Sequence, residues 1–270
     1  MRSVFLLGGL FLMSCTNTQS TMNTSSTQPQ QIIAHRGGAL LGIENSLSCI
    51  DRGIATGADM IEVDLHLTAD RQVVVCHDQT VNRTTNGRGR IEQMTLAEIR
   101  QLCLLQPDGT ASDEVIPTLD QVLMLCKNRC PLLLEIKKKR SDQYAGIEQL
   151  ADSIVKAHGM QDQVVFQSFN DEVLAALHAI DPTLRLEKLL VCPIGDKYLF
   201  DGRFVRFSAE KYSYVTSFNV FRLFASAHFI RRMHQMGKEV KVWTVNDPKR
   251  APEGADGIIT DQPEMFIPKR

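Results

Sequence analysis

Residues 61–78 read IEVDLHLTADRQVVVCHD, and the first half of this stretch alternates between two kinds of side chain. Apolar residues alternate with Glu62, Asp64 and His66, and this period of two predicts a β-strand. The second apolar run, VVVCH at 73–77, follows too closely for a crossover helix, so the two strands must form an antiparallel hairpin. One face of the first strand thus carries two acids and a histidine, and the kind of sheet decides whether that face meets water.

The rest of the chain predicts a parallel sheet, because short β-branched runs alternate with helical patterns. The strand candidates are 31–35, 60–67, 73–77, 132–137, 164–169, 185–190, 214–218, 240–245 and 256–260. The helix candidates are 45–57, 118–128, 144–159, 171–181 and 227–237. Without the hairpin strand, eight strands remain, each with a helix or helical insertion, and this number in a chain of 270 residues indicates a TIM (β/α)8 barrel.

An open doubly wound sheet is the alternative fold, but no GxGxxG motif follows the first strand. Segment 79–117 contains the turn signals Asn86-Gly87 and Pro107-Asp108-Gly109. We therefore expect an inserted loop and helix after the hairpin of the second strand, at the barrel mouth.

Carboxylates on a barrel strand do not face water, because helices cover one face of a parallel sheet and the barrel interior lies on the other. Two buried carboxylates such as Glu62 and Asp64 are costly unless a cation compensates their charge. A structural ion pair with arginine or lysine is the alternative. The residues at the ends of the other strands decide whether the two acids belong to a functional site or to a structural ion pair.

Charged and titratable residues end three more strands. Glu135 and Lys137 share one face of the LLLEIK strand. His35 and Arg36 follow the first strand, and the hairpin returns to His77. The C-terminal ends of barrel strands carry the active sites of barrel enzymes. We therefore expect these groups to converge at one mouth of the barrel.

The chemistry of this set is restricted. Three carboxylates without a nearby cysteine favour Ca2+ or Mg2+ over zinc. A cation beside arginine and lysine suits an anionic substrate, and the arginine fork matches phosphate. Two histidines can divide the general-base and general-acid roles near neutral pH. The set therefore indicates metal-assisted cleavage of a phosphate ester.

The order of the motifs resembles the glycerophosphodiester phosphodiesterase family. The matching residues are His35-Arg36-Gly37, Glu44-Asn45-Ser46, Glu62-Val63-Asp64, Leu67-Thr68-Ala69-Asp70, His77-Asp78, Arg83-Thr84-Thr85-Asn86-Gly87, Glu135-Ile136-Lys137, Ser168-Phe169, Val242-Trp243-Thr244-Val245-Asn246 and Asp256-Gly257-Ile258-Ile259-Thr260-Asp261. The similarity spans residues 32–263. The chain departs from the family at Ile43, where proline is frequent, and at Ser46, where serine replaces threonine but keeps an N-capping hydroxyl. Residues 190–212 match poorly, so substrate preference can differ there.

The resemblance implies an enzyme that hydrolyses glycerophosphodiesters to glycerol 3-phosphate and an alcohol, with Ca2+ or Mg2+ as its divalent cation. The implied site consists of the cation ligands Glu62, Asp64 and Glu135, the acid–base pair His35 and His77, the phosphate contacts Arg36 and Lys137, and the substrate-pocket residue Trp243. For Trp243, core filling is the alternative. Which histidine is the acid stays open, as does whether water or the glycerol 2-hydroxyl attacks.

Two further ionisable residues lie on predicted strands. His66 falls where the strand of Glu62 ends, which indicates a loop histidine rather than a ligand. Lys188 either points into the barrel toward phosphate or pairs in the surroundings of Glu187.

The N-terminus carries an export signal. Residues 1–15, MRSVFLLGGLFLMSC, combine Arg2, a short apolar run and Cys15 in the position of a bacterial lipobox cysteine, so they predict a lipoprotein signal peptide. A plain secretory signal is the alternative. Residues 16–31 are rich in Ser, Thr, Asn and Gln and predict a flexible tether. The barrel domain is expected over residues 32–270.

This signal predicts that the protein is exported and attached to a membrane through lipidated Cys15. Thr16 favours the outer membrane, by analogy with enterobacterial sorting. Lys and Arg number 30 against 31 Asp and Glu, so nothing indicates a nucleic-acid partner. The other cysteines lie mostly in apolar runs without a CxxC pair, which argues against zinc and leaves disulfides open. The oligomeric state also stays open.

Two other functions are compatible with the same barrel. A phospholipase D-like enzyme would act on lysolipids or sphingolipids, and an apolar mouth would favour it. A non-catalytic lipoprotein would bind phosphorylated ligands. Such binding modules lose a ligand or an acid–base residue, whereas this chain retains the full set, so we expect an enzyme.

Overall fold

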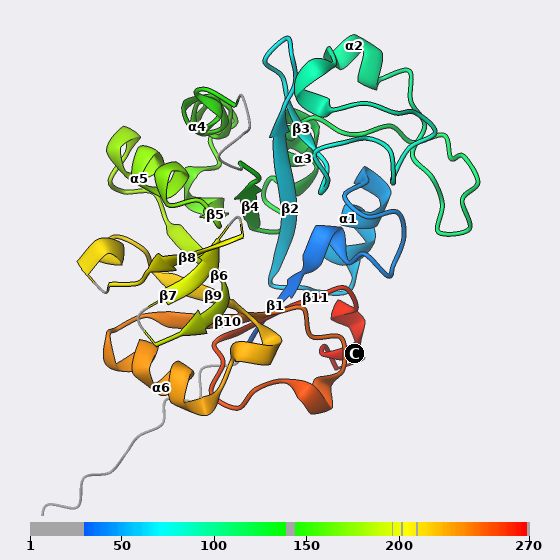
Figure 1. Cartoon of the computed structure of the whole chain (residues 1–270). Helices are drawn as coiled ribbons and strands as arrows, with labels where there is room; N and C mark the ends of the chain where they lie inside the picture. The colour runs from blue at the N-terminus through cyan, green and yellow to red at the C-terminus, as the bar shows by residue number, and fades with distance from the viewer. Residues whose placement is uncertain (1–29, 139–143, 196, 201, 209, 269–270) are drawn as a thin grey trace, which may run out of the picture.

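The protein is a closed parallel barrel with helices around it, which confirms the TIM-barrel prediction (Figure 1). The computed structural model describes residues 30–138, 144–195, 197–200, 202–208 and 210–268. The strand order β5-β4-β2-β1-β11-β10-β9-β6 closes through the pairing of β5 with β6. The predicted signal peptide with Cys15 lies outside the described residues, as does nearly all of the predicted tether. Its last residue, Gln31, already pairs with Gly257 in the barrel.

The barrel strands are β1 (Gln31–Ala34), β2 (Met60–Leu67), β4 (Leu132–Ile136), β5 (Val164–Ser168), β6 (Leu186–Ile194), β9 (Ser217–Phe221), β10 (Glu239–Trp243) and β11 (Gly257–Thr260). Outside the barrel lie β3 (Val73–Val75), β7 (Lys197–Phe200) and β8 (Arg203–Arg206). The α-helices are α1 (Leu47–Ala55), α2 (Leu96–Ile99), α3 (Leu119–Cys126), α4 (Ile147–Ala157), α5 (Asp171–Ile180) and α6 (Ala227–Gln235).

Five of the six α-helices in the described part of the chain begin at a residue whose side chain caps them, and α4 begins after Gly146 without a side-chain cap. Ser46 accepts a hydrogen bond from the Cys49 amide at the start of α1, as expected from its hydroxyl. Thr118 and Gln121 form a capping box at the start of α3. The Asn170 side chain caps α5 by accepting a hydrogen bond from the Glu172 amide.

Two connections differ from the prediction that each strand is followed by a helix. Between β6 and β9 the chain forms the β7–β8 hairpin, and between β10 and β11 it forms only the short 3-10 helix Pro248–Arg250. The strand expected over 214–218 is β9, which begins at Ser217. The hairpin lies in the segment that resembles the family least, and neighbouring Gly and charged residues hid its strand pattern from the sequence.

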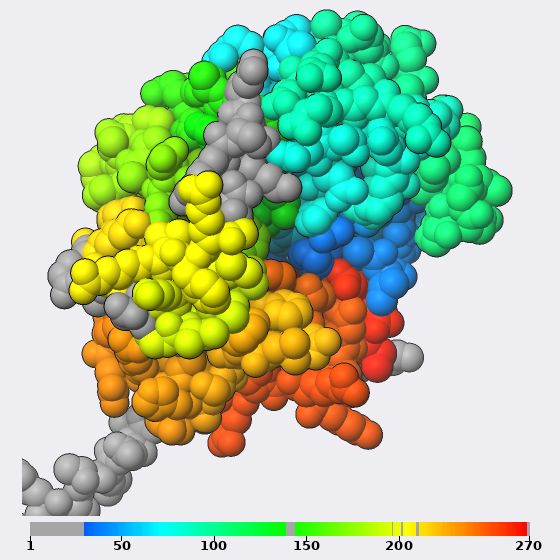
Figure 2. All heavy atoms as spheres, viewed as in Figure 1, coloured from blue at the N-terminus to red at the C-terminus, as the bar shows by residue number. Residues whose placement is uncertain are grey.

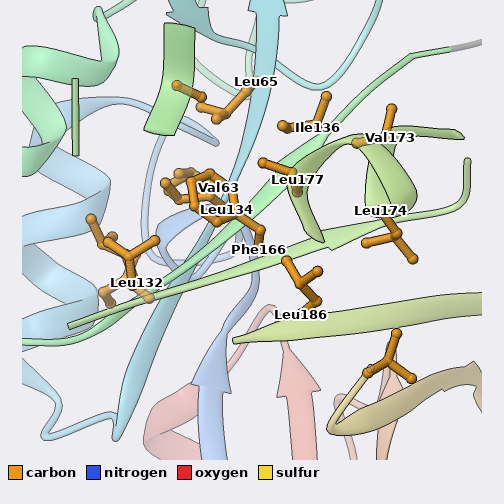
Figure 3. Close-up of a cluster of buried hydrophobic side chains, with 14 of the residues drawn as sticks. Val63, Leu65, Leu132, Leu134, Ile136, Phe166, Val173, Leu174, Leu177 and Leu186 are labelled. Atoms are coloured by element: carbon orange, nitrogen blue, oxygen red, sulfur yellow. The ribbon is translucent and has the colours of Figure 1, made fainter. Parts of the chain in front are cut away.

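Apolar side chains line both faces of the barrel strands, because the strands are buried on both sides. The larger cluster lies between strands and helices. Figure 3 shows it for Val63, Leu65, Leu132, Leu134, Ile136, Phe166 and Leu186 on strands and Val173, Leu174 and Leu177 on α5. The alternate strand residues form a smaller interior cluster of Ile33, Met60, Leu133, Val165 and Ile259. The face of β2 that carries the acids is therefore an interior face.

The insertion between β3 and α3 forms a separate lobe beside the barrel, as predicted for segment 79–117 (Figure 1). It contains α2 and the 3-10 helix Ile91–Gln93. Its small core consists of Ile43, Val74, Cys76, Val81, Ile91, Ile99, Leu104 and Ile116. The lobe thus covers the hairpin of the second strand without entering the barrel.

The six cysteines in the described part of the chain are free thiols. Four of them are buried, in keeping with the apolar runs that contain them. Within residues 30–268, leaving aside the undescribed positions, no helix has the length and hydrophobicity needed to cross a membrane.

Gly53 on α1 fixes the loop that follows β1. A Cβ atom at this position would lie 2.3 Å from the carbonyl oxygen of Gly37, so only glycine allows the close approach. Gly37 itself has φ 83°, a left-handed conformation. The helix and the loop after β1 are therefore in direct backbone contact.

We predict that Gly53→Ala lowers the free energy of unfolding by about 1–3 kcal/mol, because overpacking a backbone contact outweighs the helix propensity of alanine. The matched control is Gly42→Ala, whose Cβ would lie 3.2 Å from the end of the flexible Arg52 side chain and at an ordinary contact distance of 3.6 Å from the Cβ of Cys49. Urea denaturation of both variants measures the difference. Equal stability of the two variants would contradict the close-contact explanation.

Candidate active site

Three buried carboxylates lie together at the C-terminal ends of β2 and β4. The strand register pairs Asp64 with Glu135, and Glu62 lies two residues earlier on the same face of β2. One oxygen of each carboxylate lies within 4.8 Å of the others. The alternation read from the sequence, combined with the parallel register, therefore produces the predicted cluster of three acids.

Burial dominates the protonation of these acids. It raises the pKa of Glu62 well above its usual value, and the neighbouring charges of Asp64 and Glu135 raise it further. Burial also raises the pKa of Glu135, to about 7, although Lys137 opposes this shift. For Asp64, burial is outweighed by the positive charges nearby, above all Lys137, and its pKa is held well below the usual range. Three negative charges in one buried place thus need an additional cation.

The cluster fits a divalent cation. Asp64 Oδ1 and Glu135 Oε1 are buried and have no hydrogen-bond partner. Lys137 Nζ lies 3.2 Å from the Asp64 oxygen and 2.9 Å from the Glu135 oxygen and supplies the nearest positive charge among the described residues. Unpaired carboxylate oxygens from three side chains are the hard ligands that Ca2+ and Mg2+ prefer. The alternative of a purely structural ion pair leaves these oxygens without hydrogen bonds.

Arg36 reaches the cluster from the turn after β1. Its backbone N–H donates to Glu62 Oε2 at 2.9 Å, and its guanidinium lies 3.1 Å from Glu44 and 3.8 Å from Asp64. Arg36 has φ 52°, so the left-handed turn directs its amide and its side chain to the same place. The residue thus orients one acid and adds a positive charge beside another.

Both predicted histidines are held by carboxylates. His35 Nδ1 lies 2.6 Å from Asp261 Oδ1, and His77 Nδ1 lies 2.8 Å from Asp78 Oδ1. The pKa of Asp78 is held well below its usual value, first by the hydrogen bond from Arg83. An ionised carboxylate only accepts, so the Nδ1 atoms carry the protons and the Nε2 atoms remain for proton transfer. Burial lowers the pKa of His77.

Several residues around the site were quoted as motifs in the sequence but received no role there. Asn45 Nδ2 donates to Asp64 Oδ2 at 2.8 Å, and Gln167 Nε2 donates to Glu62 Oε1 at 3.3 Å. Arg83 forms ion pairs with Glu44 and Asp78. The signal for Asp78 and Asp261 was their position beside a site residue or just after a strand, and for Asn45 it was the family motif Glu44-Asn45-Ser46. For Gln167, the period of two along β5 was the only signal.

The expectations for His66 and Lys188 are wrong. His66 is fully buried within β2, where Nδ1 lies 2.6 Å from the Tyr144 hydroxyl and Nε2 lies 3.2 Å from the His77 carbonyl oxygen. Lys188 faces away from the barrel interior and forms an ion pair with Asp171 at 3.1 Å. Strand β2 has the predicted bounds and pairs with β3 through His66, so this residue lies within the strand and not in a loop. The partner of Lys188 comes from α5, which no local pattern reveals.

Trp243 ends β10 and lies partly buried at the rim of the interior cluster. Its Nε1–H donates to the carbonyl oxygen of Asn219 at 3.0 Å. Phe169 and Phe221 pack around the ring, with centroid distances of 5.6 and 5.1 Å. The indole therefore packs against core residues and also lies at the barrel mouth.

Comparison with known proteins gives one family. The model of the glycerophosphoryl diester phosphodiesterase family matches residues 35–265. A glycerophosphodiester phosphodiesterase of Caldanaerobacter subterraneus subsp. tengcongensis is 32% identical over 241 residues, covering 87% of this chain and 96% of that protein. A glycerophosphodiester phosphodiesterase of Bacillus subtilis is 27% identical and covers 98% of this chain and 95% of its own length.

Solved structures show the same fold and family. A phosphodiesterase of Oleispira antarctica, solved with its product sn-glycerol-3-phosphate, has a TM-score of 0.73 at 25% identity and covers 87% of this chain and 94% of that one. A glycerophosphodiester phosphodiesterase of Parabacteroides distasonis has a TM-score of 0.69 at 26% identity, with coverage of 87% and 94%. The chain therefore belongs to the glycerophosphoryl diester phosphodiesterase family and is an enzyme of that class.

Proposed function

We propose that this enzyme is a divalent-cation-dependent phosphodiesterase that hydrolyses glycerophosphodiesters to glycerol 3-phosphate and an alcohol by histidine acid–base catalysis. The observation that carries the proposal is the buried cluster Glu62, Asp64 and Glu135, flanked by two carboxylate-bound histidines. The product complex of the Oleispira antarctica phosphodiesterase supports the same substrate class.

The three carboxylates would hold Ca2+ or Mg2+, which when bound supplies electrostatic stabilisation of the phosphate oxygens. The guanidinium of Arg36 and the ammonium of Lys137 stand beside these carboxylates and would bind and orient the phosphate. The rim residue Trp243 would pack against the substrate. Binding the phosphate between fixed positive charges positions the phosphorus atom for in-line attack.

The two histidines would move the protons. One Nε2 atom accepts the proton of the attacking hydroxyl, which belongs to water or to the glycerol 2-hydroxyl. The new P–O bond forms as the bond to the departing alcohol oxygen breaks. The other imidazole, protonated at Nε2, donates that proton to the departing oxygen. If the 2-hydroxyl attacks, the product of this step is a cyclic glycerol phosphate, and water then opens that ring to glycerol 3-phosphate with the two histidines in exchanged roles. Asp261 and Asp78 keep His35 and His77 in the required tautomer.

The first prediction concerns the cation. The full-length protein should release glycerol 3-phosphate from glycerophosphocholine and glycerophosphoethanolamine with Ca2+ or Mg2+, and EDTA should abolish release. Glu62→Gln removes one ligand charge and should weaken cation binding by about tenfold or more, measured by isothermal titration calorimetry.

The matched control for Glu62→Gln is Asp152→Asn. Asp152 is also buried but pairs with Lys156 on α4, 2.9 Å away, outside the cluster. Its variant should bind the cation as the wild type does. Equal cation affinity of the two variants, or release that persists in EDTA, would refute the proposed cation site.

The second prediction concerns the histidines. His35→Ala and His77→Ala should each lower kcat by about 10²–10⁴-fold on glycerophosphocholine, because each removes one proton transfer. A p-nitrophenyl diester of glycerol 3-phosphate has a leaving group that needs no proton. The variant lacking the general acid should regain most of its activity on that substrate, and the variant lacking the base should not.

His234→Ala is the control, since His234 pairs with Asp256 on the exposed surface and should leave kcat unchanged. Recovery of both variants on the activated substrate, or of neither, would contradict a division of acid and base between the two histidines. This comparison also assigns the two roles.

We also propose that residues 1–15 are a lipoprotein signal peptide and that Cys15 carries the lipid, with residues 16–31 as a tether. The support comes from the short apolar run before Cys15 and the polar composition after it. The enzyme would then face the periplasm or the cell surface, with the outer membrane favoured by Thr16.

The third prediction tests this anchor. Wild-type protein expressed in a Gram-negative host should sediment with membranes and incorporate labelled palmitate. Cys15→Ser should lose the label. The control Cys103→Ser, a partly buried thiol in the insertion, should keep it. Labelling that survives Cys15→Ser would show that another residue is modified.

A further inference from the structure

We propose that the cavity beside the candidate active site holds an apolar substituent of the phosphodiester, so that the preferred substrates carry a hydrocarbon chain. This inference rests on the proposed function, because it concerns the substrate of the same site. It concerns the substituents on either side of the phosphate.

The cavity opens directly from the catalytic groups. Its volume is about 540 Å³, within the range of ~300–1,000 Å³ usual for small-molecule pockets. His77, Glu135 and Lys137 line its inner end. A phosphate held by these groups therefore directs one of its two ester substituents into the cavity.

Most of the lining surface of the cavity is apolar, although Gln79, Thr80 and Ser168 add polar groups to it. Phe169 follows β5, Val191 lies on β6, and Leu199 and Phe200 lie on β7, while Ile136 ends β4. A glycerol or a small alcohol has no hydrocarbon to place against five apolar side chains. A chain of several methylene groups gains from this burial, by up to about fourfold in affinity for each fully buried methylene.

The charged groups around the cavity are already paired. Asp78 binds His77 and Arg83, and Lys138 lies 2.9 Å from Glu148. Glu135 belongs to the acidic cluster. Among the described residues that line the cavity, these are the carboxylates, so neither is left to neutralise a choline or ethanolamine cation. The electrostatics therefore favour a neutral substituent.

The wall formed by the β7–β8 hairpin is built into the fold. Tyr198 on β7 is fully buried, and its hydroxyl donates to Asp171 Oδ2 at 2.5 Å. The Tyr212 hydroxyl donates to Asp171 Oδ1 at 2.9 Å, and the Lys188 ammonium lies 4.6 Å from the centre of the Tyr198 ring. The adjacent Leu199 is therefore held in place before a substrate binds, which lowers the entropic cost of binding.

The hairpin belongs to the segment that resembles the family least, and it supplies Leu199 and Phe200 to the cavity lining. In Figure 2 the hairpin (yellow) stands out from the barrel surface, across from the insertion lobe (cyan to teal). The cavity lining thus includes residues from the catalytic strand ends and from the β7–β8 hairpin.

The test compares chain length on each side of the phosphate. The full-length enzyme is assayed with the ethyl and hexyl diesters of glycerol 3-phosphate, in which the alcohol carries the chain. A second pair is glycerophosphocholine and 1-hexanoyl lysophosphatidylcholine, in which the glycerol carries it. We expect kcat/KM to be about tenfold or more higher for the longer member of one pair, mainly through a lower KM, and that pair identifies the substituent.

Variants of one hairpin provide the matched comparison. Phe200→Ala, and independently Leu199→Asn, should reduce the preference for the longer substrate toward unity. Phe204→Ala should keep the preference, because Phe204 lies on β8 with 57% exposure and is absent from the described cavity lining. Two cavity variants keep the test valid if one of them does not fold.

Three results would overturn the inference. Equal kcat/KM for the short and long members of both pairs would show that the cavity takes no hydrocarbon while the phosphodiesterase function stands. An equal loss of preference in Phe204→Ala would show that the cavity wall is not responsible. A failure to cleave any of the four diesters would overturn the proposed function itself.

Discussion

The burial of three carboxylates within 4.8 Å of one another is the constraint on which the rest of the site depends. The parallel register of β2 and β4 brings Asp64 beside Glu135, and a shift by one residue would turn the acids toward the helices. Like charges at this distance in a protein interior repel strongly. Lys137 and Arg36 supply positive charge from the strand ends, and the cluster still keeps carboxylate oxygens without hydrogen bonds.

The polar character of the barrel interior continues below the cluster. Gln167 connects Glu62 to Asn219, and Asn219 donates to Glu187 at 2.8 Å. Glu187 in turn accepts from the ammonium of Lys241. Each member of this buried chain has a partner, as a polar network in a low-dielectric interior requires. Gln167 in this network thus donates to Oε1 of Glu62, while the Arg36 amide donates to Oε2.

The two halves of the barrel serve different purposes. On the side of β1, β2 and β4, regular helices and the turn after β1 fix the charged groups. On the side of β6 and β9, a hairpin replaces the helix and forms one wall of the cavity. The hairpin supplies Leu199 and Phe200 to the cavity, while Ile136 and Phe169 come from the strand ends and Gln79 and Thr80 from the start of the insertion. The cavity that we propose for the hydrocarbon chain is thus built from three segments around the charged groups.

The sequence by itself determined the barrel, its strand ends and the cluster of acids, because a period of two and the C-terminal position of each charged residue are local properties. It also indicated the start of α1 through the capping hydroxyl of Ser46. Only the tertiary structure decided the partner of Lys188, the burial of His66 and the bond from Gln167 to Glu62, since each depends on residues distant in the chain. The β7–β8 hairpin escaped prediction for the same reason. Its short strands are stabilised by Asp171 at the start of another element, and no pattern within residues 190–212 records that contact.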